Sequence, residues 1–141
     1  MSYFSDGEMK ALTERLAGMT SPVRLVLFVQ AFGCETCATT TRILEDLTRA
    51  NPLVSLEQKN MVLDTDDVEL YGIVAAPGIA IIGDRDRGLR AYGAPDGYEL
   101  ISLLEAILLA SSGDSGLSEQ SRALVATLTE PRDLKIFSTP T

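Results

Sequence analysis

Residues 23–37 read VRLVLFVQAFGCETC, an apolar stretch that ends in two cysteines three positions apart. Its first eight residues are mostly aliphatic, β-branched or aromatic, a composition typical of a buried strand. Residues 39–50 follow with Ile43, Leu44 and Leu47 at helical spacing, which predicts a helix with one apolar face. The two cysteines therefore lie at a turn from a strand into a helix.

Cys34 and Cys37 are the only cysteines of the 141-residue chain. At the N-terminus of a helix, unpaired N–H groups and the helix dipole stabilise a thiolate relative to a thiol. One helical turn separates positions i and i+3, so Cys37 is within disulfide reach of Cys34. We therefore predict that Cys34 is an accessible nucleophile and Cys37 a resolving thiol, the pair that thiol–disulfide exchange needs.

Other uses of the C-x-x-C pair stay open at this point. A tetrahedral zinc site would need carboxylates or a second subunit, because the chain has no third cysteine and no histidine. The pair could be an inert structural disulfide, although closing so small a loop gains little chain entropy. Two chains sharing four thiols could hold an iron–sulfur cluster. We expect no metal and no bound cofactor.

Composition and charge exclude several classes of function. Hydrophobic residues make up 45% of the chain and charged residues 23%, as in an ordinary globular domain. A net charge of −8 without a basic patch argues against binding to nucleic acid or to anionic membrane surfaces. Residues 1–8 lack the basic and apolar regions of a secretory signal, and no apolar run could span a bilayer. We expect a cytoplasmic protein, in which a cysteine pair is more often catalytic than structural.

The remainder of the chain predicts further helices and strands. Ser5 and Glu8 fit a capping box that begins a first helix, and this helix ends near Gly18. The other expected elements are strands at residues 53–60, 79–82 and 89–92, and helices at residues 64–72, 98–110 and 118–129. A parallel β-α-β half followed by an antiparallel hairpin and a helix gives an α/β fold. We predict a mixed four-stranded sheet with helices on both faces and extra N-terminal and C-terminal helices.

The helix at residues 98–110 is apolar around more than half of its circumference. One face of a sheet cannot bury so wide an apolar surface, so this helix needs a second partner. The helix at residues 118–129, which carries Leu124, Val125 and Leu128, is the expected partner.

The arrangement resembles the thioredoxin fold. A narrower resemblance connects the chain to the N-terminal unit of the glutaredoxin-like protein disulfide oxidoreductases, and to the N-terminal domain of the alkyl hydroperoxide reductase flavoprotein. It rests on three segments that span nearly the whole chain: YGIVAAP at residues 71–77, RAYGAPDGYE at residues 90–99 and LSE at residues 117–119. The resemblance implies an enzyme that exchanges disulfides with protein clients and can take electrons from a flavoprotein reductase.

The resemblance also implies the residues of a client site. Pro77 is expected to be a cis proline opposite the dithiol, which would turn the N–H and C=O of Ala76 outward for a client peptide to pair with. The residues expected to bind the client are Gly33, Glu35, Thr36, Ala76, Pro77 and Gly93.

The chain departs from this family at two positions. Many thioredoxins carry a buried aspartate six residues before the first cysteine, as proton acceptor for the second; Phe28 stands there instead. Water or Glu35 would then have to move the proton. A carboxylate at Glu35, next to Cys34, opposes formation of the thiolate. We therefore expect a more reducing dithiol than in strongly oxidising relatives.

The C-terminus predicts a division of the chain. Residues 1–130 would form the thioredoxin-like domain, and residues 131–141 resemble the first strand of a missing second unit of the same kind. Without that unit, the strand could pair with a neighbouring molecule and form a homodimer. The alternative function is a non-catalytic half that offers a binding or packing surface while the active dithiol lies in the second unit.

Overall fold

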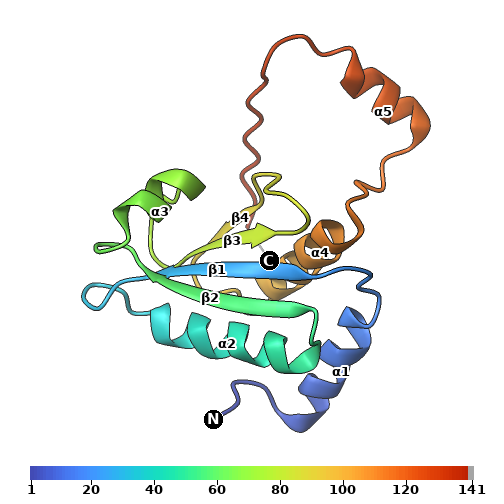
Figure 1. Cartoon of the computed structure of the whole chain (residues 1–141). Helices are drawn as coiled ribbons and strands as arrows, with labels where there is room; N and C mark the ends of the chain where they lie inside the picture. The colour runs from blue at the N-terminus through green and yellow to red at the C-terminus, as the bar shows by residue number, and fades with distance from the viewer. Residues whose placement is uncertain (140–141) are drawn as a thin grey trace.

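The computed structural model describes residues 1–139, which form a four-stranded sheet and five helices (Figure 1). The strands pair in the order β2-β1-β3-β4, with β1 parallel to β2 and antiparallel to β3, and β3 antiparallel to β4. In chain order the elements are α1 (Asp6–Leu16), β1 (Val23–Val29), α2 (Cys37–Ala50), β2 (Val54–Asn60), α3 (Thr65–Tyr71), β3 (Gly78–Ile82), β4 (Arg90–Tyr92), α4 (Tyr98–Ser112) and α5 (Glu119–Ala126). The predicted mixed sheet is confirmed.

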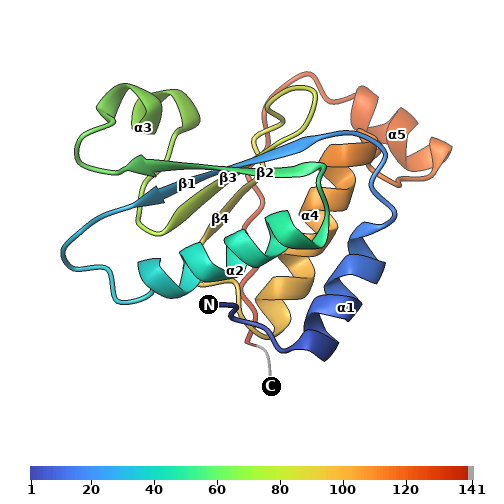
Figure 2. The same cartoon turned by 60° about the horizontal axis from the view of Figure 1, so that its bottom comes forward.

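Helices cover both faces of the sheet, as predicted (Figure 2). Alternate side chains of β1 point to opposite faces, so Leu25 and Leu27 join one buried cluster while Val26 and Phe28 join the other. The larger cluster lies under α1, α2 and α4, and the smaller one lies under α3. Both clusters take residues from β1, which is why its apolar run is nearly continuous.

Helix α4 packs against the sheet and α1, and not against α5 as we expected. Leu12 and Leu16 of α1 enter the same core as Leu104 and Ile107 of α4. Helix α5 has no buried residue and stands away from the sheet (Figure 1). The prediction was wrong because α1 already covers the apolar side of α4, and periodicity alone does not say which surface an amphipathic helix meets.

The chain after α5 contributes nothing to the sheet within the described residues. Residues 127–139 are exposed and form no helix or strand. The segment predicted to begin a second unit, residues 131–141, extends two residues beyond the part that the structure describes. Its pairing with a second unit or with another copy stays a prediction.

The N-terminal segment is held on α2 by one buried carboxylate, Asp46, which is 0% exposed. Its Oδ2 accepts hydrogen bonds from the Tyr3 N–H at 2.7 Å, the Phe4 N–H at 3.1 Å and the Ser2 hydroxyl at 2.9 Å, and Oδ1 pairs with Arg49. Burial alone would raise the pKa of Asp46, but these hydrogen bonds and the Arg49 charge outweigh it and leave the pKa below its ordinary value.

Replacing this carboxylate should therefore cost stability in a pH-dependent way. We expect Asp46→Asn to lower the free energy of unfolding by about 2 kcal/mol at pH 7, since charged hydrogen bonds are lost in a buried site. Because the pKa of Asp46 is lower in the folded than in the unfolded chain, its charged form stabilises the fold at pH values above the unfolded-state pKa. This contribution disappears as pH falls through the folded-state pKa. Urea unfolding should thus show a larger difference between wild type and variant at pH 7 than at pH 3.

The exposed neighbour Glu45 supplies the control, because Glu45→Gln removes a charge from the same helix without removing a buried partner. It should leave the unfolding free energy nearly unchanged. Equal losses in the two variants, or a loss in Asp46→Asn that does not shrink at pH 3, would contradict the role given to Asp46.

Candidate redox site

Three segments meet at the end of the sheet where β1 finishes, on the left of Figure 1. The first is the loop from Val29 to α2, which carries both cysteines. Strand pairing brings the other two: Phe28 lies opposite Gly78, directly after the Ala76–Pro77 bond, and Val29 lies opposite Asn60 at the end of β2. The sheet register therefore places the proline loop and the loop after β2 at the same end as the dithiol.

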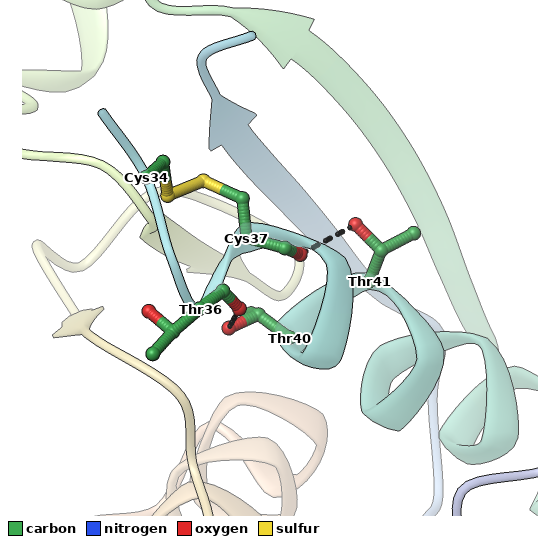
Figure 3. Close-up of a disulfide and its surroundings, with 5 residues drawn as sticks. All are labelled: Cys34, Thr36, Cys37, Thr40 and Thr41. Carbon is green, nitrogen blue, oxygen red and sulfur yellow. Dashed lines mark hydrogen bonds between the residues drawn. A yellow bond between two sulfur atoms is a disulfide. The ribbon is translucent and has the colours of Figure 1, made fainter. Parts of the chain in front are cut away.

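Cys34 and Cys37 form a disulfide with their Cα atoms 5.5 Å apart (Figure 3). Cys34 is partly exposed, whereas Cys37 is only 7% exposed. Helix α2 begins at Cys37, two residues earlier than predicted, and Thr36 is its N-cap. Cys34 thus lies in the loop just before the helix, and it is the more exposed of the two cysteine residues, as predicted.

Two threonine hydroxyls fix the first turn of α2. The Thr40 hydroxyl donates to the Thr36 carbonyl and the Thr41 hydroxyl donates to the Cys37 carbonyl, each at 2.9 Å (Figure 3). Both bonds run from a side chain to the carbonyl four residues earlier. Sequence reasoning missed these residues, although a threonine four positions after Thr36 or Cys37 was a readable signal.

The residues expected to bind a client lie on the cysteine loop, on the proline loop and just after β4, at this end of the sheet. The Ala76–Pro77 peptide bond is cis, as the resemblance implied, and the Gly93 N–H donates to the Pro77 carbonyl at 3.0 Å. Gly33 has a φ of 71°, in the left-handed region that favours glycine. Exposed or partly exposed members of the set are Gly33, Glu35, Thr36, Ala76 and Gly93, and Pro77 is buried. Contact with a client stays a prediction.

Phe28, which stands where many thioredoxins carry an aspartate, cannot accept a proton. Phe28 is 0% exposed, and its ring lies 5.9 Å from the ring of Tyr71. Lys59 is paired with Phe28 across the sheet, and hydrogen bonds to Glu57 and Asp67 raise its pKa well above the ordinary value, so it stays charged. A charged ammonium cannot accept a proton either, so water or Glu35 would have to take the proton of Cys37.

Within residues 1–139, no three potential ligands from histidine, cysteine, aspartate and glutamate gather closely enough to hold a metal ion. In the same part of the chain, none of the helices combines the length and the apolar character that crossing a membrane requires.

No protein-family model and no curated protein matches the chain, but solved structures do. A protein disulfide oxidoreductase of Aeropyrum pernix is 28% identical, with a TM-score of 0.78 over 88% of this chain and 55% of that one. The alkyl hydroperoxide reductase component AhpF of Enterococcus faecalis is 22% identical, with a TM-score of 0.79 over 90% of this chain and 62% of that one. Thioredoxin-2 of the malaria parasite is 15% identical, with a TM-score of 0.52 over 62% and 84%.

These likenesses and the order of the strands in the sheet show that the chain has the thioredoxin fold. Among the solved structures it resembles in particular a protein disulfide oxidoreductase, and its own Cys34–Cys37 pair supports a thiol–disulfide redox activity. The chain spans 55% and 62% of the length of the first two proteins. The likeness therefore establishes the fold, while the activity, clients and partners of this chain need separate arguments.

The position of the proline loop depends on Gly78. A Cβ at this residue would lie 2.7 Å from the Ala75 carbonyl oxygen, 2.8 Å from Ile73 and 3.2 Å from Tyr92. We expect Gly78→Ala to lower the free energy of unfolding by about 1–3 kcal/mol, because the backbone that carries Ala75 must shift. Urea unfolding measures this loss. Gly7→Ala is the control, since a Cβ there meets nothing within 4 Å, and equal stability of the two variants would refute the argument.

Proposed function

We propose that this protein is a thiol–disulfide oxidoreductase that exchanges disulfides with protein clients through Cys34 and Cys37. The observation that carries the proposal is the asymmetry of the pair: Cys34 is partly exposed, whereas Cys37 is buried at the first residue of α2, and their Cα atoms lie 5.5 Å apart. A structural disulfide would not need one accessible partner at the meeting point of three loops. The likeness to a protein disulfide oxidoreductase supports the same conclusion.

The exchange proceeds in two displacements when the dithiol starts reduced. The Cys34 thiolate attacks one sulfur of the client disulfide, which forms a mixed disulfide and releases the other client sulfur as a thiolate that takes up a proton. Cys37 then loses its proton and attacks the Cys34 sulfur, which forms the Cys34–Cys37 bond and releases the second client thiolate. The client gains two electrons and the dithiol loses two. The reverse sequence oxidises a dithiol client.

The client backbone would be held beside the sulfurs by the proline loop. No hydrogen bond to the Ala76 N–H or C=O occurs within the described residues. An extended peptide could pair with this backbone as an added strand while its disulfide lies on Cys34. In this proposal Gly33, Glu35, Thr36 and Gly93 form the rim that the peptide crosses.

Regeneration of the dithiol needs a reductant from outside the chain. A flavoprotein reductase is our candidate, because one similar protein belongs to an alkyl hydroperoxide reductase. A second thioredoxin-like unit beginning within residues 131–141 would be another route for electrons, and this division of the chain at residue 130 remains part of the proposal.

Single cysteine variants test the exchange directly. With Cys37→Ser, attack by Cys34 should still occur but resolution should fail, so mixed disulfides with a model protein disulfide should accumulate. With Cys34→Ser, they should be nearly absent. Non-reducing gels and intact-mass measurement after acid quenching would count the trapped adducts.

The same experiment separates the enzyme from the alternative of a non-catalytic half. If neither variant traps a client and the wild-type protein reduces no model disulfide, the dithiol is not catalytic. Equal trapping by the two variants would contradict the assignment of Cys34 as the attacking thiol.

The redox potential should depend on the charge of Glu35. This exposed carboxylate adjoins Cys34 and disfavours the thiolate of the reduced form. We expect Glu35→Gln to stabilise the reduced dithiol and to raise the potential by on the order of 20 mV. Equilibration in glutathione buffers measures the shift, with Glu14→Gln on the remote helix α1 as a control of equal charge. A potential that is unchanged, or lower, would show that Glu35 does not oppose the thiolate.

A further inference from the structure

Two of the segments that carry the resemblance contact each other in the structure. The segment at residues 71–77 contains the proline loop, residues 72–77, which connects α3 to β3. The segment at residues 90–99 begins with β4, the edge strand that pairs with β3. Strand β4 is only 3 residues long, yet its side chains and the residue after it hold the proline loop at several points.

Arg90 and Gly93 hold the two ends of the proline loop. The Nε–H of Arg90 donates to the carbonyl of Tyr71, the last residue before the loop, at 2.8 Å. Both terminal nitrogens of the Arg90 guanidinium donate to Asp86, at 2.6 and 2.9 Å, which fixes the side chain in this place. At the other end, the Gly93 N–H donates to the Pro77 carbonyl at 3.0 Å.

Tyr92 holds the middle of the proline loop. Its hydroxyl accepts a hydrogen bond from the Val74 N–H at 3.3 Å and donates a longer one to the Gly72 carbonyl at 3.5 Å. Within residues 1–139, the bond from Val74 is the only hydrogen bond made by the backbone of residues 74–76. The Val74 side chain is 80% exposed, so packing holds it little. The position of this stretch, which ends at Ala76, thus depends on one phenolic oxygen.

The Tyr92 side chain reaches the loop because its partner in the sheet is a glycine. Tyr92 lies opposite Gly78 in the pairing of β3 with β4. A Cβ on Gly78 would come within 3.2 Å of the Cε1 atom of the Tyr92 ring, so a larger residue would crowd the ring at this position. Arg90 and Tyr92 are two residues apart on one strand, so both side chains lie on the face of the sheet that meets the loop.

The middle of the proline loop is the part that the proposed function uses. In that proposal, the backbone of Ala76 pairs with an extended client peptide beside the sulfurs. Such pairing needs N–H and C=O groups at defined positions, and a misplacement of about 1 Å can slow a reaction strongly. A side chain that fixes this stretch would therefore favour substrates with a peptide backbone and leave other disulfides unaffected.

We infer that Tyr92 is a positioning residue of the exchange reaction. Its hydroxyl holds Val74, and through Val74 it keeps the Ala76 backbone in the place where a client peptide pairs. This inference rests on the proposed function and adds to it a residue that acts through the proline loop; the covalent exchange is the two-step displacement described above.

Single-turnover kinetics on Tyr92→Phe test the inference, because this change removes one oxygen and keeps the ring. The reduced protein is mixed with excess disulfide, quenched with acid, alkylated and weighed, which gives the rate constant for oxidation of the dithiol. One substrate is a peptide disulfide, and the other is bis(2-hydroxyethyl) disulfide, which has no peptide backbone. We expect the variant to react about fivefold more slowly with the peptide and at the wild-type rate with the small disulfide.

The ratio of the two rate constants is the readout, because a general loss of stability or a change at the cysteines would alter both. Tyr98→Phe is the matched control, since it removes the same atom from a tyrosine that is 72% exposed at the start of α4, and it should keep the wild-type ratio.

Hydrogen exchange followed by NMR tests the contact itself. The Val74 amide should exchange about tenfold faster in Tyr92→Phe than in the wild-type protein, because it has lost its acceptor. The same amide should exchange at the wild-type rate in Tyr98→Phe.

The outcomes separate the inference from the proposed function. If the wild-type protein reacts with neither disulfide, the proposed function fails and the inference with it. If the wild-type protein is active and Tyr92→Phe keeps its ratio, only the inference is overturned. If the ratio falls but exchange at Val74 is unchanged, Tyr92 contacts the client directly and does not act through the loop, which also overturns the inference.

Discussion

Strand β1 is hydrogen-bonded along both edges and covered on both faces, and this confinement determines where the chemistry can occur. Its partners β2 and β3 leave it no free edge, and helices on either side bury the side chains from Leu25 to Phe28 completely. A strand held so firmly delivers the chain that follows it, with Cys34, to a defined point in space. The proline loop and the turn after β2 reach that point only because their own strands are in register with β1.

The residue at position 28 affects how the proton of Cys37 can move during the exchange. Where many thioredoxins carry an aspartate, β1 has Phe28 packed on Tyr71, and Lys59, paired with Phe28 across the sheet, is bound by two acids. Phe28 therefore stabilises the packing of this face but cannot act as a base for Cys37. The proton of Cys37 must then pass to the exposed carboxylate Glu35 or to solvent. Phe28 thus supplies buried packing at the end of β1, where an aspartate would supply proton transfer.

The sequence predicted the sheet well because its signals were local and redundant. The capping box at Ser5, the apolar run of β1 and the helix expected at residues 64–72 are each visible within a few neighbouring residues, and the structure has all three. The partner of α4 was missed because a helical stripe identifies a buried face but not its neighbour. The exposure of Phe32 and Leu63 was missed for a related reason: it depends on how two loops from different strands meet, and no periodicity records that.

The absence of histidine from this sequence simplifies the counting of protons during turnover. The chain has no histidine, and the ammonium of Lys59 is kept charged by Glu57 and Asp67. Of the side-chain types that remain, thiols are the ones whose ordinary pKa lies closest to neutrality. Heat signals recorded in buffers of different ionisation enthalpy would accordingly report the protonation of the dithiol itself, with no imidazole background to subtract.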